Sequence, residues 1–225
     1  MTGIPRETVR DWNYGRSLRQ RRDAGFPCSS DHHISQLDGN RYGYLLGIYL
    51  GDGCISQHPR GVTRLRVTLG AIYPYIIGER GTAIEAVSGK RVLVLRRHDA
   101  RCVEVSAYWK HWPCVIPQHG RGPKHLRRIL LTKWQRDIAM ADPRPFLRGL
   151  IHSDGCRIIA TERKGRYVRR APRYGFKNRS EDILGLFVEA GGVVGVHVTR
   201  PSPTQIAVYR KDSVARLDDF IGPKH

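Results

Sequence analysis

The hydrophobic and polar positions of this chain follow helical spacing in some stretches and strict alternation in others. Residues 42–50 are almost wholly apolar, which predicts a buried helix ending at Asp52-Gly53. Between residues 63 and 69, Arg64, Arg66 and Thr68 alternate with leucine and valine, as expected of a half-buried strand. Further patterns in the first half predict a helix at 75–87, strands at 91–98 and 102–106, and a short helix from about residue 108.

The second half repeats this order of elements. A helix predicted at 146–155 is followed by strands at 157–162 and 170–178, a helix at 180–190, strands at 193–200 and 205–210, and a helix at 211–220. We therefore expect an α+β (mixed α/β) fold of two pseudo-symmetric helix-strand-strand-helix-strand-strand-helix modules. Their antiparallel sheets would turn apolar residues toward the helices and basic residues outward.

The same patterns divide the chain into segments. The two modules cover residues 41–125 and 146–225, and residues 126–145 join them with a helix at about 132–140. Residues 1–22 are predicted to form a basic, helical segment that resembles the turn and recognition helix of a helix-turn-helix motif without its first helix. A surface helix packed on the body is the alternative for this segment. Residues 23–40, rich in Ser, Asp, Gly and His, are a predicted linker.

Two pairs of similar segments support a duplicated module. LLGIYLGDG ends at Gly53 and LRGLIHSDG ends at Gly155, so the aspartates of the two segments are 154 − 52 = 102 residues apart. Gly-Pro-Lys-His begins at Gly122 and again at Gly222, an offset of 222 − 122 = 100 residues. Two markers with nearly equal offsets indicate two copies of one unit.

Charge selects the class of partner. The 225 residues include 39 Lys and Arg against 20 Asp and Glu, for a formal net charge of +19. Such an excess favours a polyanion, because contacts with phosphates release condensed counterions. No apolar run is long enough to span a membrane, and no polybasic block lies beside an apolar anchor. Five scattered cysteines without a CxxC pair indicate reduced thiols and a cytoplasmic protein.

Small residues recur along both Asp-Gly helices. Gly47 and Gly51 are four residues apart, as are Gly149 and Ser153, so each helix has a stripe of small residues along which a second helix can pack closely. The glycine after each aspartate is expected to take a left-handed conformation that ends the helix.

If the two helices pack side by side, Asp52 and Asp154 come together at one end of the interface. Two neighbouring carboxylates repel each other, and divalent cations relieve that repulsion. Mg²⁺ suits an oxygen-rich site and retains waters that can be activated. The sequence alone therefore predicts metal-dependent chemistry on nucleic acid.

The two nine-residue segments resemble the namesake motifs of the LAGLIDADG homing endonucleases in their single-chain form, over about residues 41–225. The resemblance implies a monomer with internal pseudo-two-fold symmetry that binds a long double-stranded DNA site in a saddle formed by its two sheets. It implies Mg²⁺-dependent hydrolysis of one phosphodiester on each strand, and a role in intron or intein mobility. Asp52 and Asp154 would bind the metals, with main-chain carbonyls from Gly51 and Ser153.

The resemblance also implies a basic residue near each active site. Lys110 and Arg210, near the ends of the fourth strands, are the candidates, followed by Lys124 and Lys224. The outward strand residues would read DNA: Arg64, Arg66, Thr68, Arg96, His98, Arg173, Lys177, His197, Gln205 and Tyr209. Two other functions stay open, a transcription regulator of the same fold that does not cut, and an RNA maturase that assists splicing.

Overall fold

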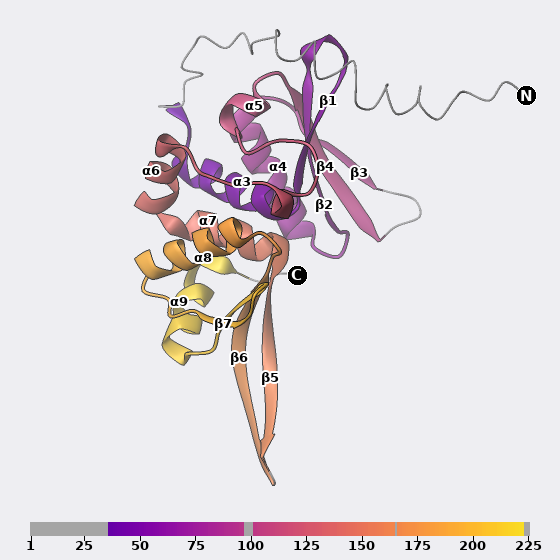
Figure 1. Ribbon diagram of the computed structural model, residues 1–225. Coiled ribbons are helices and arrows are strands. Elements are labelled where there is room, and N and C mark those ends of the chain that lie inside the picture. The colour runs from indigo at the N-terminus through magenta and orange to yellow at the C-terminus, as the bar shows by residue number, and fades with distance from the viewer. Residues whose placement is uncertain (1–35, 97–100, 165, 223–225) are drawn as a thin grey trace, which may run out of the picture. The chain divides into compact units, whose positions relative to one another are not determined.

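Two sheets of identical strand order form the body of the protein in the computed structural model, which describes residues 36–96, 101–164 and 166–222 (Figure 1). The first module consists of α3 (Gly39–Gly51), β1 (Gly53–Gln57), β2 (Thr63–Gly70), α4 (Pro74–Ser88), β3 (Leu93–Arg96), β4 (Cys102–Trp109) and α5 (Trp112–Val115). After α6 (Lys133–Ala141), the second module consists of α7 (Pro143–Asp154), β5 (Gly155–Lys164), β6 (Tyr167–Lys177), α8 (Glu181–Val193), β7 (Thr199–Ser202), β8 (Gln205–Val208) and α9 (Lys211–Ile221).

Both sheets are antiparallel, and their orders are β1-β2-β4-β3 and β5-β6-β8-β7. The helix-strand-strand-helix-strand-strand-helix order thus occurs twice, and the predicted α+β fold with a repeated module is confirmed. The residue bounds of the modules stay predictions. No helix in the described part of the chain combines the length and apolar character needed to cross a membrane.

The helices α3 and α7, which we call the motif helices, lie against each other at the centre of the molecule (Figure 1). Asp38 begins α3 by accepting hydrogen bonds from the main-chain nitrogens of Asn40 and Arg41. Every residue from 42 to 50 is buried, because α3 packs against α7 on one side and against α4 on another. A helix surrounded in this way needs apolar residues all round, as the sequence has.

The sheets bury one face each. On β2, Leu65 and Val67 are fully buried while the alternating Arg64 and Arg66 stay accessible, which confirms the predicted alternation. In the second sheet the buried face includes Phe176, whose ring stacks on a phenylalanine of α8 at 4.8 Å between centroids. Within the described residues, the basic side chains of β2 thus lie on the face of the sheet opposite its buried face.

Some predicted boundaries are wrong. The helix α8 continues to Val193, where a strand was expected, and β7 begins only at Thr199. The strand β4 runs to Trp109, past the expected start of a helix near residue 108. The segment 1–22, most of the predicted linker, His98 and Lys224 lie outside the described residues.

The glycines after the aspartates do not have the expected left-handed conformation. Gly155 is extended, with φ −105° and ψ 168°, and Gly53 is absent from the glycines with positive φ. Each is nevertheless required, because an added Cβ would lie 2.5 Å from the Tyr49 Cα at Gly53 and 2.6 Å from the Ile151 Cα at Gly155. The missing side chain lets the strand fold back over the last turn of the helix.

Candidate metal and nucleic-acid site

The motif helices touch through their main chains, because each has a glycine at the crossing point. A Cβ built on Gly47 would lie 2.8 Å from the Leu150 nitrogen and 3.0 Å from the Gly149 Cα. One built on Gly149 would lie 2.9 Å from the Ile48 nitrogen and 3.0 Å from the Gly47 Cα. Both positions exclude a larger residue, since a backbone atom cannot rotate out of the way as the end of a side chain can. The stripes of small residues thus pack together as the sequence predicts.

This crossing brings the C-terminal ends of the motif helices together. A Cβ on Gly51 would lie 3.3 Å from the Asp154 Cγ and would overlap the side chain of Ser153. Asp52 is the C-cap of α3, and Asp154 is the last residue of α7. Both carboxylates therefore lie at the negative ends of helix dipoles, which increases their need for nearby cations.

A buried arginine provides one such cation. Arg80 of α4 is 1 % exposed, and its Nη2 donates to the Asp52 Oδ2 at 3.3 Å and to the His152 carbonyl at 2.9 Å. Among the described residues its Nε and Nη1 have no hydrogen-bond partner. Since a buried arginine stays charged, Asp52 has a permanent counter-charge from within its own module.

Asp154 has a different neighbour. The Asn178 side-chain amide, just after β6, donates to the Asp154 Oδ2 at 2.7 Å. The Asn178 Oδ1 accepts from the Ser180 main-chain nitrogen at 2.8 Å, which fixes the direction of the amide. The two carboxylates of this pseudo-symmetric protein thus accept hydrogen bonds from different groups, a charged guanidinium at Asp52 and a neutral amide at Asp154.

Lys124 lies between the ends of the motif helices and the first sheet. Its Nζ donates to the carbonyls of Gly51 and Gly53, at 2.8 Å each, and is 5.0 Å from the centre of the Tyr49 ring. Burial lowers the pKa of Lys124 to about 8, although the carboxylates of Asp154 and Asp52 both favour its charged form. Its ammonium group is therefore close enough to interact with both acids.

A cavity of about 290 Å³ opens beside Asp154. Its walls come from the end of α3, from the segment around Lys124 and from the residues that follow β6: Leu50, Gly51, Lys124, His125, Asp154, Lys177, Asn178 and Arg179. A carboxylate surrounded by lysine and arginine side chains suits a ligand that combines a cation with a phosphate.

The donor atoms at this end fit a hard divalent cation. The groups available are the carboxylates of Asp52 and Asp154 and the carbonyl of Gly51, which has a second lone pair beside its bond to Lys124. In the described ranges, no group of three or more His, Cys, Asp and Glu side chains forms a metal site. A few oxygen ligands with space for water is the coordination that Mg²⁺ favours. The Ser153 hydroxyl donates to main-chain carbonyls of its own helix, and the Ser153 carbonyl at the end of α7 stays the predicted ligand.

Most residues predicted to contact DNA share the outward face of a sheet. Strand register places Arg64, Arg66 and Thr68 on one face of the first sheet, and pairs Lys177 with Gln205 on the second. The Arg173 guanidinium lies 5.9 Å from the centre of the Tyr209 ring. Arg64 is held in place by Glu104 and by a 2.9 Å hydrogen bond to the Ser106 hydroxyl.

Two predicted DNA residues are placed differently. Arg96 pairs with the buried Val103, so it lies on the helix-facing side of the sheet and the prediction of an outward position is wrong. His197 precedes β7 instead of lying in a strand, and its main-chain nitrogen donates to the Ser213 hydroxyl at 3.0 Å.

The structure does not bring Lys110 or Arg210 to the carboxylates. Lys110 follows Trp109, which pairs with Thr63, and Thr63 pairs with Gln57 at the end of β1 remote from Asp52. Arg210 likewise lies beyond Val208, the far end of β8 relative to Gln205. The fourth strands end away from the acids, which is why position along these strands misled the sequence prediction.

Sequence reasoning missed Arg80 and Asn178. Arg80 did have a signal, since it lies four residues from both Ile76 and Ile84 on the apolar stripe of α4. A charged residue in that stripe must be paired when it is buried. Asn178 has no comparable signal.

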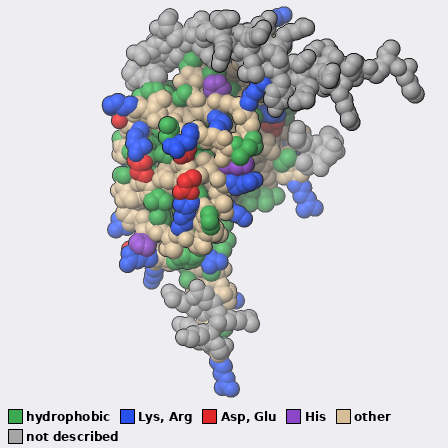
Figure 2. Space-filling view, viewed as in Figure 1, with side chains coloured by type: hydrophobic (Ala, Val, Ile, Leu, Met, Phe, Trp, Pro, Cys, Tyr) green, Lys and Arg blue, Asp and Glu red, His purple; other side chains and the backbone are tan. Residues whose placement is uncertain are grey.

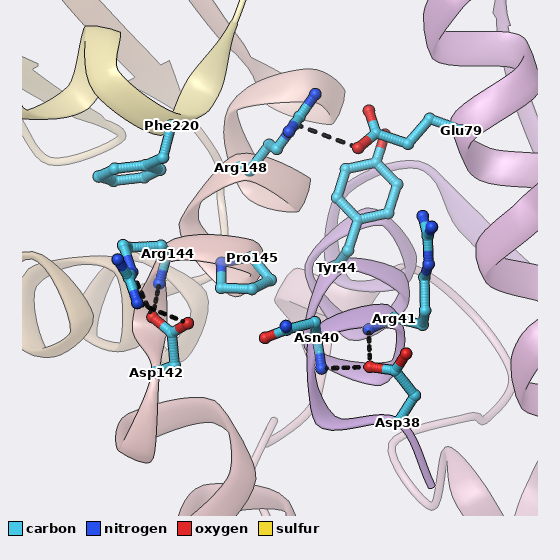
Figure 3. Close-up of a pocket in the computed structure, with 10 residues that line it drawn as sticks. All are labelled: Asp38, Asn40, Arg41, Tyr44, Glu79, Asp142, Arg144, Pro145, Arg148 and Phe220. Atoms are coloured by element: carbon cyan, nitrogen blue, oxygen red, sulfur yellow. Dashed lines mark hydrogen bonds and ion pairs between the residues drawn. The ribbon is translucent and has the colours of Figure 1, made fainter.

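The opposite end of the motif helices holds a larger cavity, of about 500 Å³ (Figure 3). The Arg148 and Glu79 side chains point toward each other across it, with the Arg148 Nε 3.2 Å from the Glu79 Oε1. Further along α7, in its last turn, the buried His152 ring lies 3.0 Å from the Tyr44 hydroxyl and 2.9 Å from the Ile221 carbonyl. The Arg148–Glu79 ion pair and the His152–Tyr44 contact thus link the two modules along the length of α7.

Two four-stranded antiparallel sheets on a glycine-packed helix pair define a LAGLIDADG-type fold. At a TM-score of 0.50 the chain resembles I-DmoI in complex with DNA and Ca, with 14 % identity over 82 % of this chain and 91 % of that one. It resembles the LAGLIDADG meganuclease I-AabMI bound to uncleaved DNA equally well, with 10 % identity over 80 % and 82 %. Full-length DUF199/WhiA from Thermatoga maritima gives a TM-score of 0.51 and 15 % identity over 82 % of this chain.

This chain spans about half of that WhiA protein, 55 %. No protein-family model matches the sequence, and no curated protein matches it. Identities of 10–15 % establish the fold alone.

Proposed function

We propose that this chain is a site-specific, divalent-metal-dependent DNA endonuclease of the homing type. The observation that carries the proposal is the delivery of Asp52 and Asp154 to one end of a helix pair whose main chains are in contact. The strand faces on either side of that end carry basic residues, and the cavity beside Asp154 includes three more basic side chains, Lys124, Lys177 and Arg179. Acids among cations, facing outward between two sheets, suit a phosphodiester backbone.

In this proposal Asp154 and Asp52 hold Mg²⁺, with main-chain carbonyls of Gly51 and Ser153 as further ligands. A bound Mg²⁺ supplies an activated water and stabilises negative charge on the phosphate. Lys124 neutralises charge on a phosphate next to the acids, and its hydrogen bonds to main-chain carbonyls fix its position. Arg80 and Asn178 orient the carboxylates from behind.

DNA would lie across the outward faces of both sheets. The residues we propose as contacts are Arg64, Arg66, Thr68, Arg173, Lys177, His197, Gln205 and Tyr209. Arginine pairs with guanine by two hydrogen bonds in the major groove, at about 1–3 kcal/mol of discrimination for each such pair. Double-stranded DNA is accordingly the proposed partner.

The test starts from a randomised duplex library incubated with the protein in Mg²⁺ or Ca²⁺. Sequencing all new ends should reveal one long site that is cut on both strands only in Mg²⁺. On that site, Asp52→Asn and Asp154→Asn should each abolish double-strand cutting while binding in Ca²⁺ is retained. Asp137→Asn is the matched control, because Asp137 lies on the exposed surface of α6 paired with Lys133. Full cutting by either motif variant would overturn the proposal.

One observation favours a second function, a DNA-binding regulator of the same fold. The buried guanidinium of Arg80 already neutralises Asp52, which weakens the case for a metal at that acid. A regulator would select a sequence from the same library in Mg²⁺ without producing any new ends. Scission in Mg²⁺ excludes it.

A further inference from the structure

The second module carries an extended two-stranded ribbon that the first module lacks. The strands β5 and β6 pair over ten residues each, from Gly155–Phe176 to Lys164–Tyr167, whereas β6 pairs with β8 only over Tyr174–Lys177. In the described part of the chain, seven residue pairs, from Ile158–Arg173 to Lys164–Tyr167, therefore have no third strand beside them. At about 3.3 Å per residue this ribbon is about 23 Å long. In Figure 1 it projects beyond the rest of the second module.

The first module differs at the equivalent place. All eight residues of β2, from Thr63 to Gly70, pair with β4. The whole paired length of the β1–β2 hairpin therefore has a third strand beside it. The ribbon is thus an addition to the repeated fold and no consequence of its symmetry.

The ribbon contributes exposed apolar side chains instead of core residues. Ile158, Ile159 and Val168 are 41 %, 65 % and 50 % exposed, so these β-branched side chains are not buried by the protein itself. A free two-stranded ribbon is only marginally stable in water. An extension of this length is understandable when a partner covers it.

Charge identifies the partner. Residues 158–173 include six basic residues and one acidic residue, a net charge of 6 − 1 = +5. Figure 2 shows a basic side chain, drawn in blue, at the outer tip of this projection. Pro172 has no N–H to donate, and with basic residues it makes the free edges poor templates for a strand of another protein copy. Repulsion between like charges also disfavours a second copy.

We propose that residues 158–173 form an arm that lies in the major groove of DNA beyond the half-site of the second module. The major groove accepts a two-stranded ribbon, and its thymine methyl groups can contact exposed apolar side chains such as Ile159. At 3.4 Å per base pair, 23 Å corresponds to about 7 base pairs. The contacted DNA is therefore longer on the side of the second module by about this number. The inference rests on DNA binding by the proposed function, but not on cleavage.

The test is a hydroxyl-radical footprint in Ca²⁺ on the duplex recovered from the library. In the first variant, residues 159–172 are replaced by Asn-Gly, a pair suited to a two-residue hairpin turn between Ile158 and Arg173. Its thermal unfolding should match that of the wild type, since the removed segment has no third strand. We expect the wild-type footprint to be asymmetric about its centre. The variant, which keeps only the first of the seven ribbon pairs, should lose about 6 base pairs of protection from the longer side alone.

A second variant keeps the ribbon and removes charge. In Arg166→Gln/Arg170→Gln/Arg173→Gln, the slope of log affinity against log salt should fall by up to about 3, at about 0.9 per lost phosphate contact. The control, Arg128→Gln/Lys133→Gln/Arg136→Gln, removes the same charge from side chains that are 79 %, 90 % and 50 % exposed elsewhere, and its slope should hardly change.

The proposal that the ribbon binds DNA would be overturned if the shortened variant gave the wild-type footprint. It would also be overturned if the two triple variants had equal slopes of log affinity against log salt. Binding without any scission would refute the proposed nuclease activity, and the footprint would still decide whether the ribbon contacts DNA. A wild-type protein that binds no duplex at all refutes both.

Discussion

Replacing Gly47 with alanine adds a methyl group where the main chains of the motif helices are already in contact. The added carbon would lie 2.8 Å from the Leu150 nitrogen and 3.0 Å from the Gly149 Cα, and it would overlap the Phe146 carbonyl. These obstacles are backbone atoms, so relief requires the two helices to separate. Overpacking of this kind costs about 1–3 kcal/mol, whereas alanine in a helix gains about 0.5–1 kcal/mol over glycine.

The overpacking cost should lie near the upper end of its range, because no rotamer change can relieve the contact. After the gain in helix propensity is subtracted, Gly47→Ala should lower the free energy of unfolding by about 2 kcal/mol. For a chain of this size, 1 kcal/mol shifts Tm by about 2–4 °C, so Gly47→Ala should lower Tm by about 4–8 °C. The matched control is Gly78→Ala, because Gly78 is also helical and a Cβ there would meet nothing within 4 Å. That variant should raise Tm by about 1–4 °C.

Thermal unfolding of both variants in one buffer, followed by circular dichroism, checks the reasoning. The opposite signs are the decisive result, because helix propensity alone would move both variants upward. If Gly47→Ala is as stable as Gly78→Ala, the main chains of the motif helices are not in contact, and the placement of the two aspartates loses its basis.

Three further predictions concern charges. Arg80→Met should lower the free energy of unfolding, measured by urea titration in the presence of a chelator, by about 3 kcal/mol, since Asp52 loses its buried counter-charge. Adding Ca²⁺ should restore part of this loss. If Ca²⁺ restores none of it, a cation site at Asp52 is contradicted. Ca²⁺ at about 100 times its Kd should stabilise the wild-type protein by about 2.7 kcal/mol. The same concentration should stabilise Asp154→Asn much less. An equal shift in Tm for both proteins would exclude Asp154 as a ligand. The hydrogen bond from Arg157 holds the pKa of Asp218 below its usual range, so Asp218→Asn should cost about 1 kcal/mol at pH 6. That difference should shrink as the pH falls through the carboxyl pKa, and urea titrations at pH 6 and pH 3 that give the same difference would refute the assignment.

The central helix pair could be predicted from the sequence because its signals are local. Gly47 and Gly51 recur four residues apart on one apolar helix, and Gly149 with Ser153 repeats the spacing on the other. Such spacing specifies a face that permits close approach, and a duplicated motif supplies the partner. The alternation on β2 was likewise readable, because burial of one face imposes a period of two.

What could not be predicted depends on contacts between distant segments. Arg80 reaches Asp52 from 28 residues along the chain, and only the packing of α4 on α3 decides that it does so. The two valines near residue 193 favour a strand by propensity, yet α8 continues to Val193. Strand β8 ends away from the acids because of its register, which placed Arg210 out of reach.

The different hydrogen-bond donors at the two aspartates have a consequence for the order in which the strands of a duplex would be cleaved. Two identical subunits must repeat every substitution on both sides of their axis, so their two acids remain equivalent. A single chain with both copies is free of this constraint, and here a guanidinium accompanies Asp52 while an amide accompanies Asp154. Under the proposed function, the two DNA strands meet acids of different cation affinity and break at different rates. Scission by this protein then passes through a nicked duplex, in which the first break falls more often on one strand than on the other.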